Sequence, residues 1–183
     1  MKNTAEEQKF VALLRGINVG GHHKVPMAAL RETLGNMGFQ QVKTLLNTGN
    51  IWFEAGKEDE KGLAAKIAVQ LENSFGFPIP VIIRRADNIK KIVEANPFSE
   101  VNRTPATRLY VSFLPHTPRS KLSIPYISPD GSFTIISTIE HTVFSVLDLD
   151  KSKSVDAMKI LEKEFGKNIT TRNWNTVVKI AQM

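Results

Sequence analysis

The chain of 183 residues contains no cysteine. Disulfide bonds, thiolate zinc sites and a cysteine nucleophile are therefore all excluded. Long apolar runs are lacking as well, since none approaches the ~20 residues that a helix needs to cross a bilayer. The N-terminal stretch MKNTAEEQK carries acidic residues and has no apolar core, so it does not resemble a signal peptide. We expect a cytoplasmic protein that has no membrane partner.

Motifs that bind cofactors or metals are also missing. The chain has no GxGxxG dinucleotide pattern, no HxxxH pair and no GxSxG nucleophile motif. His22 and His23 are adjacent, and neighbouring side chains seldom face the same point, while no nearby carboxylate would complete a metal shell. The sequence therefore predicts no cofactor and no metal site. It leaves open whether the protein is an enzyme, because it indicates no catalytic residue.

Positive charge is unevenly distributed along the chain. The 24 Lys and Arg residues outnumber the 18 Asp and Glu residues, and residues 84–125 carry eight of the former against three of the latter. A solvated surface explains this excess most simply, because residues that are close in sequence need not form one patch. The alternative is a nucleic-acid-binding module that uses this basic segment. Its basic residues are Arg84, Arg85, Lys90, Lys91, Arg103, Arg108, Arg119 and Lys121.

Hydrophobic periodicity predicts six elements in the first half of the chain. Apolar residues recur at helical spacing over 25–39 and 59–75, and Pro26 and Gly38 suit the first turn and the exit of the first helix. The NTGN stretch at 47–50 is typical of a tight hairpin turn between two strands. The order strand, helix, strand, strand, helix, strand is that of a ferredoxin-like, split βαβ domain. The expected strands are residues 10–15, 41–46, 51–55 and 79–85.

The second half of the chain repeats this plan less clearly. A linking helix over 87–96 precedes it, and the proline-rich segment 115–131 forms a long connection that could hide a short helix. We therefore predict the α+β class, with two ferredoxin-like (α-β plait) subdomains whose sheets are antiparallel, at residues 1–86 and 87–183. In the second subdomain we expect strands at 108–114, 133–137 and 142–149, a helix at 154–165, a short extended segment at 169–172 and a terminal helix from about 173.

The predicted strands are apolar on both faces. Residues 11–14 and 81–83 lack the apolar–polar alternation of a sheet that has one face in water. The second face should therefore be buried, either by the other half of the chain or by another copy of it. This pattern motivates a further hypothesis, in which the protein is an interaction module or a subunit of a homo-oligomer.

The stretch GINVGGHHK at 16–24 joins the first strand to the first helix. In the predicted topology this loop, the turn at 47–50 and the GFP connection at 76–78 share one end of the sheet. The simpler interpretation of its glycines is that they allow positive φ in a tight loop. The alternative is anion binding, because backbone N–H groups and the helix dipole favour an anion at a helix start. The glycine spacing is that of a P-loop, but His22 replaces the P-loop lysine.

Polar residues around this loop are the candidate ligand contacts. Two further candidates, Arg172 and Asn173, precede the terminal helix, where they would either bind an anion or satisfy backbone groups of the helix. We hypothesise a cytoplasmic binding protein for a small anionic or phosphorylated ligand at the glycine-rich loop 16–24. The candidate contacts are Arg15, Gly16, Asn18, Gly20, Gly21, Lys24, Asn47, Asn50, Arg172 and Asn173.

Five stretches of the chain together resemble a known family. VALLRGINVGG, KVPMAALR, NTGNIWFE, NPF and TTRNWNTVVK are similar to signature stretches of the domain of unknown function (DUF) 1697 family, which is mostly bacterial. The resemblance covers the chain after its first eight residues and implies two ferredoxin-like subdomains, but it implies no activity. Similar sequences usually have Lys-Asn at the positions of His22 and His23, and Ser at the position of Thr48. The missing lysine would complete the P-loop spacing, so its absence suggests that the glycines matter more than the cation.

Overall fold

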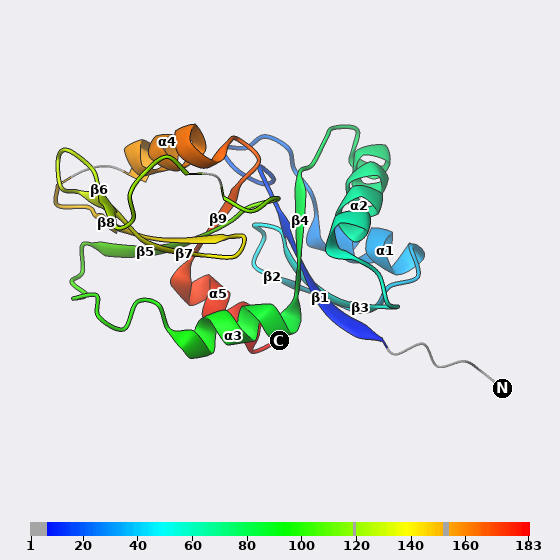
Figure 1. Ribbon diagram of the computed structural model, residues 1–183. Helices are drawn as coiled ribbons and strands as arrows, with labels where there is room; N and C mark the ends of the chain where they lie inside the picture. Colours follow the sequence, from blue (N-terminus) through cyan, green and yellow to red (C-terminus); the bar gives the residue numbers. More distant parts are fainter. Residues whose placement is uncertain (1–6, 119, 152–153) are drawn as a thin grey trace. The chain divides into compact units, whose positions relative to one another are not determined.

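The computed structural model describes residues 7–118, 120–151 and 154–183 of the chain (Figure 1). These ranges hold no helix that is both long and apolar enough to span a membrane. The strands are β1 (Gln8–Leu14), β2 (Gln40–Leu45), β3 (Asn50–Ala55), β4 (Val81–Arg85), β5 (Thr107–Phe113), β6 (Tyr126–Ile127), β7 (Phe133–Ile139), β8 (Thr142–Asp148) and β9 (Thr170–Asn173). The helices are α1 (Met27–Asn36), α2 (Glu60–Phe75), α3 (Ala86–Ala95), α4 (Ser154–Phe165) and α5 (Trp174–Ala181).

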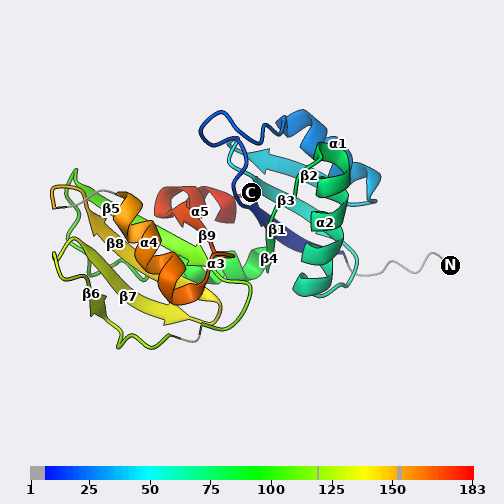
Figure 2. The same ribbon diagram turned by 90° about the horizontal axis from the view of Figure 1, so that it is seen from above.

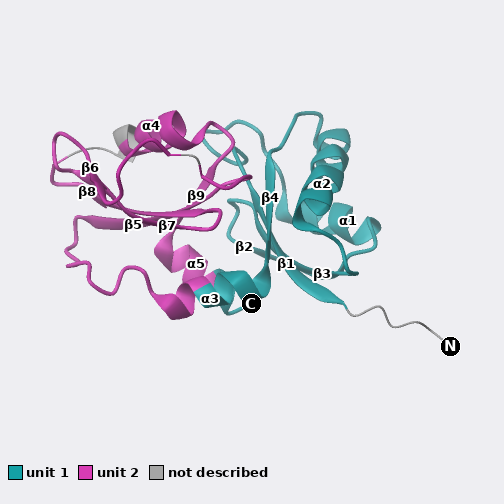
Figure 3. Cartoon of the chain, in the orientation of Figure 1, with its two compact units in different colours: residues 1–91, 180–183 teal, residues 92–179 magenta. Residues whose placement is uncertain are grey.

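The chain forms two compact units, each with its own sheet (Figure 3). Unit 1 comprises residues 1–91 and 180–183, and unit 2 comprises residues 92–179. Every strand pairing in both sheets is antiparallel. The described residues therefore have the predicted α+β class with two antiparallel sheets. The division between the units falls inside α3, and the boundary predicted from the sequence lies at the start of the same helix.

The sheet of unit 1 has the strand order β2-β3-β1-β4. Together with the element order β1-α1-β2-β3-α2-β4, this is the ferredoxin-like arrangement predicted for the first half of the chain. Helices α1 and α2 both cover the same face of this sheet (Figure 2). Leu30 and Leu34 of α1 pack there with Leu63, Ile67 and Leu71 of α2, and all five side chains are fully buried.

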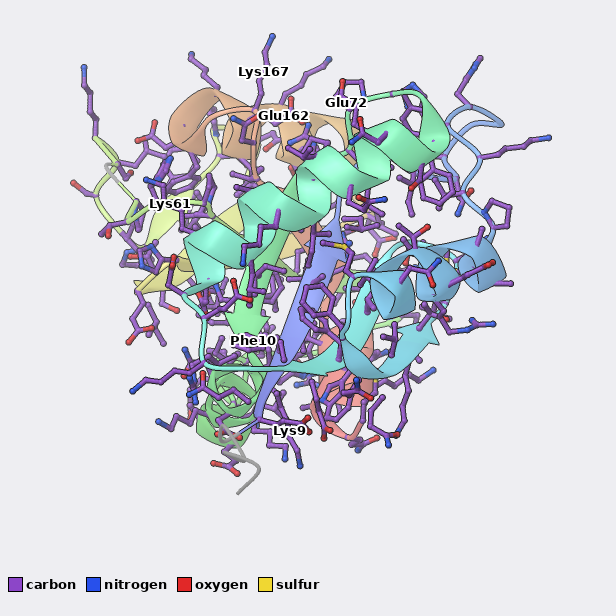
Figure 4. The ribbon with its side chains drawn as sticks, turned by 90° about the vertical axis from the view of Figure 1, so that its right-hand side faces the viewer. Lys9, Phe10, Lys61, Glu72, Glu162 and Lys167 are labelled. Carbon is purple, nitrogen blue, oxygen red and sulfur yellow. The ribbon has the colours of Figure 1, made fainter. Side chains whose placement is uncertain are left out.

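The opposite face of this sheet is also buried over the middle of β1. Phe10 is fully buried in the core beneath the helices, whereas the neighbouring Lys9 lies on the other face with its ammonium 5.9 Å from the ring centroid of Trp52 (Figure 4). On that face Val11 and Leu13 are 1% and 0% exposed. The expectation that both faces are buried is thus confirmed for β1.

The sheet of unit 2 has the order β6-β7-β8-β5-β9. Its last four strands, β7-β8-β5-β9, repeat the order of unit 1, and α4 covers one face through Ala157 and Leu161, which pack with Phe133 and Val143. The element corresponding to α1 differs. Between β5 and β7 the described residues contain no helix, and the short strand β6 extends the edge of the sheet instead. Unit 2 is therefore a variant of the predicted plan that lacks the first crossover helix.

The described residues of the segment 115–131 do not contain the short helix that the sequence allowed for. Four prolines occur in this stretch, and each removes a backbone donor and disfavours helix for the residue before it. The chain instead pairs Tyr126 with Ile135 across β6 and β7.

Candidate functional site

The loop between β1 and α1 forms a short hairpin of its own. Val19 and His22 pair as an antiparallel bridge, and the His22 N–H donates to the Val19 carbonyl oxygen at 3.2 Å. Gly20 and Gly21 lie between them with φ of 60° and 80°. Glycine adopts two consecutive left-handed conformations without strain, as tight hairpin turns require. The two glycines therefore serve the turn itself.

Asn18 ties this hairpin to the rest of unit 1 with its side chain. Its Oδ1 accepts from the Val25 N–H at 2.8 Å, and its Nδ2 donates to the Val25 carbonyl oxygen at 3.0 Å. The same Nδ2 donates to the Asn47 carbonyl oxygen at 2.7 Å, in the turn between β2 and β3. The backbone φ of Asn18 is 55°, which asparagine tolerates better than most residues. Because backbone groups occupy its amide, Asn18 positions the loop.

Three connections meet at one end of the unit 1 sheet, as the sequence predicts. The Leu14 N–H donates to the Gly49 carbonyl oxygen at 2.8 Å, which joins the first loop to the β2–β3 turn. The Arg15 N–H donates to the Pro80 carbonyl oxygen at 3.0 Å, which joins the loop to the connection before β4. We call this part of unit 1 the loop end, and it comprises residues 15–26, 46–50 and 76–80.

The glycine-rich loop does not lead directly into the helix, and on this point the prediction was wrong. Helix α1 begins at Met27 rather than at residue 25, because Val25 is bonded to Asn18 and Pro26 is extended, with ψ of 133°. The N–H groups of Asn18, His22 and Val25 are all donated within the loop. These three donors therefore do not form a phosphate cradle of the P-loop kind, in which loop N–H groups point at the anion.

The two asparagines of the β2–β3 turn differ in their access to solvent. Asn50 is fully buried, and its Nδ2 donates to the Leu45 carbonyl oxygen at 3.0 Å and to Thr48 Oγ1 at 3.1 Å. It closes the turn from the inside. Asn47 is exposed, although its carbonyl oxygen accepts from Asn18. Of this pair, it is Asn47 whose side chain a ligand in solvent can reach.

Cationic, polar and apolar side chains are exposed together at the loop end. Lys24 and His22 are exposed, and the half-buried Arg15 begins the loop. The three segments of the loop end contain no Asp or Glu. Val19 and Leu46 are also exposed there, at 65% and 52%. The segments that build this surface thus contribute positive charge and no carboxylate.

The two neighbouring histidines of the loop have different surroundings. The imidazole of His23 stacks on the ring of Phe77 with centroids 4.4 Å apart, and its Nδ1 lies 3.3 Å from the Gly16 carbonyl oxygen. His22 lies in the exposed turn. Across the part of the chain that the structure describes, no group of three or more His, Asp or Glu side chains is arranged to hold a metal ion.

Arg172 and Asn173 lie on β9 of unit 2. They form hydrogen bonds with residues of β9 and with the start of α5. Arg172 is 9% exposed, and its Nη1 donates to Thr170 Oγ1 at 2.8 Å and to the Thr171 carbonyl oxygen at 3.0 Å. Burial lowers the pKa of Arg172 to about 10. The Oδ1 of Asn173 accepts from the Asn175 N–H at 3.0 Å, in the first turn of α5. Both residues thus satisfy structural groups within unit 2.

Arginines of the basic segment 84–125 also bond within the protein. Arg84 is 8% exposed and its Nη1 lies 3.4 Å from a carboxylate oxygen of Glu60. Arg108 donates from Nη1 to the Pro105 carbonyl oxygen at 2.7 Å. Arg119, which the sequence analysis counted in this segment, lies outside the described residues. Arginines that are buried or hydrogen-bonded within the protein contribute less to a phosphate-binding surface than the count of basic residues in the sequence suggests.

Unit 2 contains a cavity that no sequence pattern indicated. His116, His141 and Glu164 line this cavity. They are far apart in sequence, so local spacing could not have linked them, and the two histidines stand alone in their segments. The proximity of these three residues is known only from the fold, which brings their segments together.

Comparisons with known proteins place the fold but name no activity. The sequence model of the family described as "Protein of unknown function (DUF1697)" matches residues 8–129. Among curated proteins, none matches the chain. A solved structure of the conserved bacterial protein SP0830 from Streptococcus pneumoniae is similar over 96% of this chain and 98% of that chain, with a TM-score of 0.68 and 22% sequence identity. At this identity the similarity concerns the fold alone.

Proposed function

Because the chain belongs to the DUF1697 family of proteins of unknown function, its own residues must carry any functional assignment, and we propose that it is a cytoplasmic protein that binds a small phosphate-bearing anion. The site of binding is the loop end of unit 1. This proposal keeps the place that the sequence indicated and changes the roles of several residues there.

One observation carries the proposal, namely the charge of the loop end. Its three segments bring Arg15 and Lys24 to one end of the sheet and contain no acidic residue. Lys24 and His22 are exposed, so a ligand can reach them without any rearrangement of the loop. A surface that combines cations without interspersed carboxylates attracts anions and raises their local concentration.

The rigidity of the loop supports the same proposal. The side chain of Asn18 bonds to Val25 and Asn47, and the ring of His23 stacks on Phe77, so the hairpin is held from two sides. A scaffold that is ordered before binding loses less conformational entropy when the ligand arrives. In this assignment Asn18 and Asn50 position the loop end.

The residues that contact the anion in this proposal lie at the accessible surface. Lys24 supplies a mobile ammonium that suits a phosphate as a point charge. Asn47 supplies an amide donor from the neighbouring turn. The exposed Gly20–Gly21 turn lies at the hairpin tip, where the absence of side chains lets a ligand approach the backbone closely.

A titration with inorganic pyrophosphate tests this function. We expect Lys24→Glu to weaken binding about ten-fold or more, equivalent to about 1.4 kcal/mol, because it replaces an attraction by a repulsion. Lys57→Glu is the matched control, since Lys57 is exposed and follows β3 at the opposite end of the same sheet. Isothermal titration calorimetry of the three proteins at about 50 and about 200 mM salt measures both affinity and its screening.

Two outcomes would contradict the proposal. An equal loss of affinity in Lys24→Glu and Lys57→Glu would mean that pyrophosphate responds only to net charge. Absence of binding to the unmodified protein at low salt would remove the anion site altogether. Circular dichroism of both variants would check that the loop substitutions leave the fold intact.

A further inference from the structure

Unit 2 has an open cavity of about 670 Å³ at one end of its sheet, a size within the usual range for small-molecule sites. It lies where the chain leaves β5, beside the turn between β7 and β8 and the last turn of α4. The Leu114 N–H donates to the His141 carbonyl oxygen at 2.8 Å and so holds two of these segments together. This cavity is separate from the loop end, since all of its lining residues belong to unit 2.

Glu164 carries the formal charge among the described residues that line this cavity. Its Oε1 accepts from Ser120 Oγ at 2.7 Å and from the Lys121 N–H at 2.6 Å. The hydrogen bond from Ser120 lowers the pKa of Glu164 most, and the backbone donors and the charge of Lys121 act in the same direction. The carboxylate is therefore fixed in place and negatively charged at neutral pH.

The bonds to Glu164 leave room for a ligand at the same carboxylate. A carboxylate has about four acceptor positions on its two oxygens. Among the described residues, the bonds from Ser120 and Lys121 both end on Oε1, and the backbone of Leu122 also acts on the carboxylate. Oε2 can accept from an N–H donor that enters the cavity. The ammonium of Lys121 is exposed and does not line the cavity, so it competes with a cationic ligand only from outside.

The other walls of the cavity suit a flat apolar body. Leu114, Pro115, Pro118 and Phe165 provide hydrocarbon and ring surface. His116, Thr117 and His141 add polar groups beside this surface. Proline, phenylalanine and imidazole rings all offer flat faces against which an aromatic ring can pack.

We propose that this cavity binds a small cationic ligand in which a protonated nitrogen group, such as an amidinium, is attached to a flat ring. The cationic group donates to the Glu164 carboxylate, and the ring packs against Phe165 and the two prolines. The proposal is independent of anion binding at the loop end, and the two sites take ligands of opposite charge.

Three probes of nearly equal size and different charge test the proposal. Benzamidine is a cation, benzamide is neutral and benzoate is an anion. NMR titrations of the full-length protein are expected to shift the signals of His116, His141 and Phe165 with benzamidine, which should bind about ten-fold more tightly than benzamide because of its charge-assisted hydrogen bond. Benzoate should bind more weakly than either.

Two substitutions assign the effect to Glu164. Glu164→Gln keeps the size of the side chain and an acceptor for Ser120, and it should remove the preference for benzamidine over benzamide. Glu72→Gln is the matched control, since Glu72 is an exposed carboxylate on α2 of unit 1 (Figure 4). His116→Lys alters an exposed lining residue and should weaken benzamidine about ten-fold by charge repulsion, so the test holds even where Glu164→Gln unfolds the protein.

The proposal is overturned by any of three results. The first is that benzoate binds as tightly as benzamidine. The second is that both Glu164→Gln and His116→Lys still prefer benzamidine to benzamide. The third is that none of the probes shifts the signals of the lining residues at millimolar concentration. Binding of pyrophosphate at the loop end would be unaffected by these results, so the two assignments fail separately.

Discussion

At the scale of single residues, Asn18 determines the shape of the glycine-rich loop. It combines a left-handed backbone conformation with three side-chain hydrogen bonds to Val25 and Asn47. The two contributions have different physical origins, because the first concerns the backbone energy and the second concerns bonds between segments. Substitutions that remove one contribution at a time can separate them.

We expect Asn18→Ala to lower the free energy of unfolding by about 2–3 kcal/mol, because it loses the three bonds and because alanine tolerates the left-handed backbone conformation less well than asparagine does. Asn18→Gly loses the same bonds without the cost in φ, so it should be about 1 kcal/mol less destabilising than Asn18→Ala. Urea unfolding of the three proteins measures both differences. Equal stability of Asn18→Ala and the unmodified protein would show that the loop is not held by this side chain.

At the scale of elements, the β2–β3 turn packs directly against the end of β1. A β-carbon placed on Gly49 would lie 2.6 Å from Leu14 Cβ and 3.0 Å from Ile17 Cδ1, and the φ of Gly49 is 79°. Gly20 also has a positive φ, of 60°, but a β-carbon there would meet nothing within 4 Å. The two turns of the loop end therefore need glycine for different reasons. At Gly49 the reasons are close packing and a positive φ, and at Gly20 the reason is the positive φ alone.

Alanine substitutions should reveal this difference. Gly20→Ala is expected to cost about 1 kcal/mol through backbone strain alone, whereas Gly49→Ala adds a clash with buried side chains and should cost about 3 kcal/mol. Thermal unfolding of both variants provides the comparison. A loss of stability no larger in Gly49→Ala than in Gly20→Ala would mean that β1 and the turn separate easily, and it would weaken the description of the loop end as rigid.

The elements of unit 1 could be predicted because their local signals agree with their packing. Asp59 caps α2 by accepting from the Gly62 N–H at 2.9 Å, and Gly76 ends it with φ of 81°. The start of α1 could not be predicted in this way. It depends on the bond that the Asn18 side chain donates to the Val25 carbonyl oxygen, which joins residues seven positions apart and competes with the helix for that oxygen.

At the scale of the whole molecule, the candidate sites depend on contacts between distant segments. The loop end was predictable as a place, because the ferredoxin-like topology puts three connections at one end of the sheet. The burial of Asn50 could not be predicted from the sequence, since its bonds to Leu45 and Thr48 form only in the folded turn. In unit 2, the bond that holds the cavity residue Glu164 comes from Ser120, which is 44 positions away, so no local sequence pattern predicts it.

The net charge of the molecule leads to the last prediction, which concerns nucleic acids. A formal charge of +6 gives a weak attraction to any polyanion, while Arg84 and Arg108 of the basic segment are engaged in bonds within the protein. We therefore expect binding to oligonucleotides that does not depend on their sequence. For about three phosphate contacts, the affinity should fall about 40-fold when salt rises from about 50 to about 200 mM.

Fluorescence anisotropy with two oligonucleotides of equal length and different sequence measures both properties. Similar affinities that decline together with salt are the expected result, because counterion release from phosphates is the same for every sequence. A preference for one sequence of about ten-fold or more that persists at the higher salt would require contacts to base edges. Such a preference would contradict the expectation and would make the basic segment 84–125, rather than the loop end, the first place to look for function.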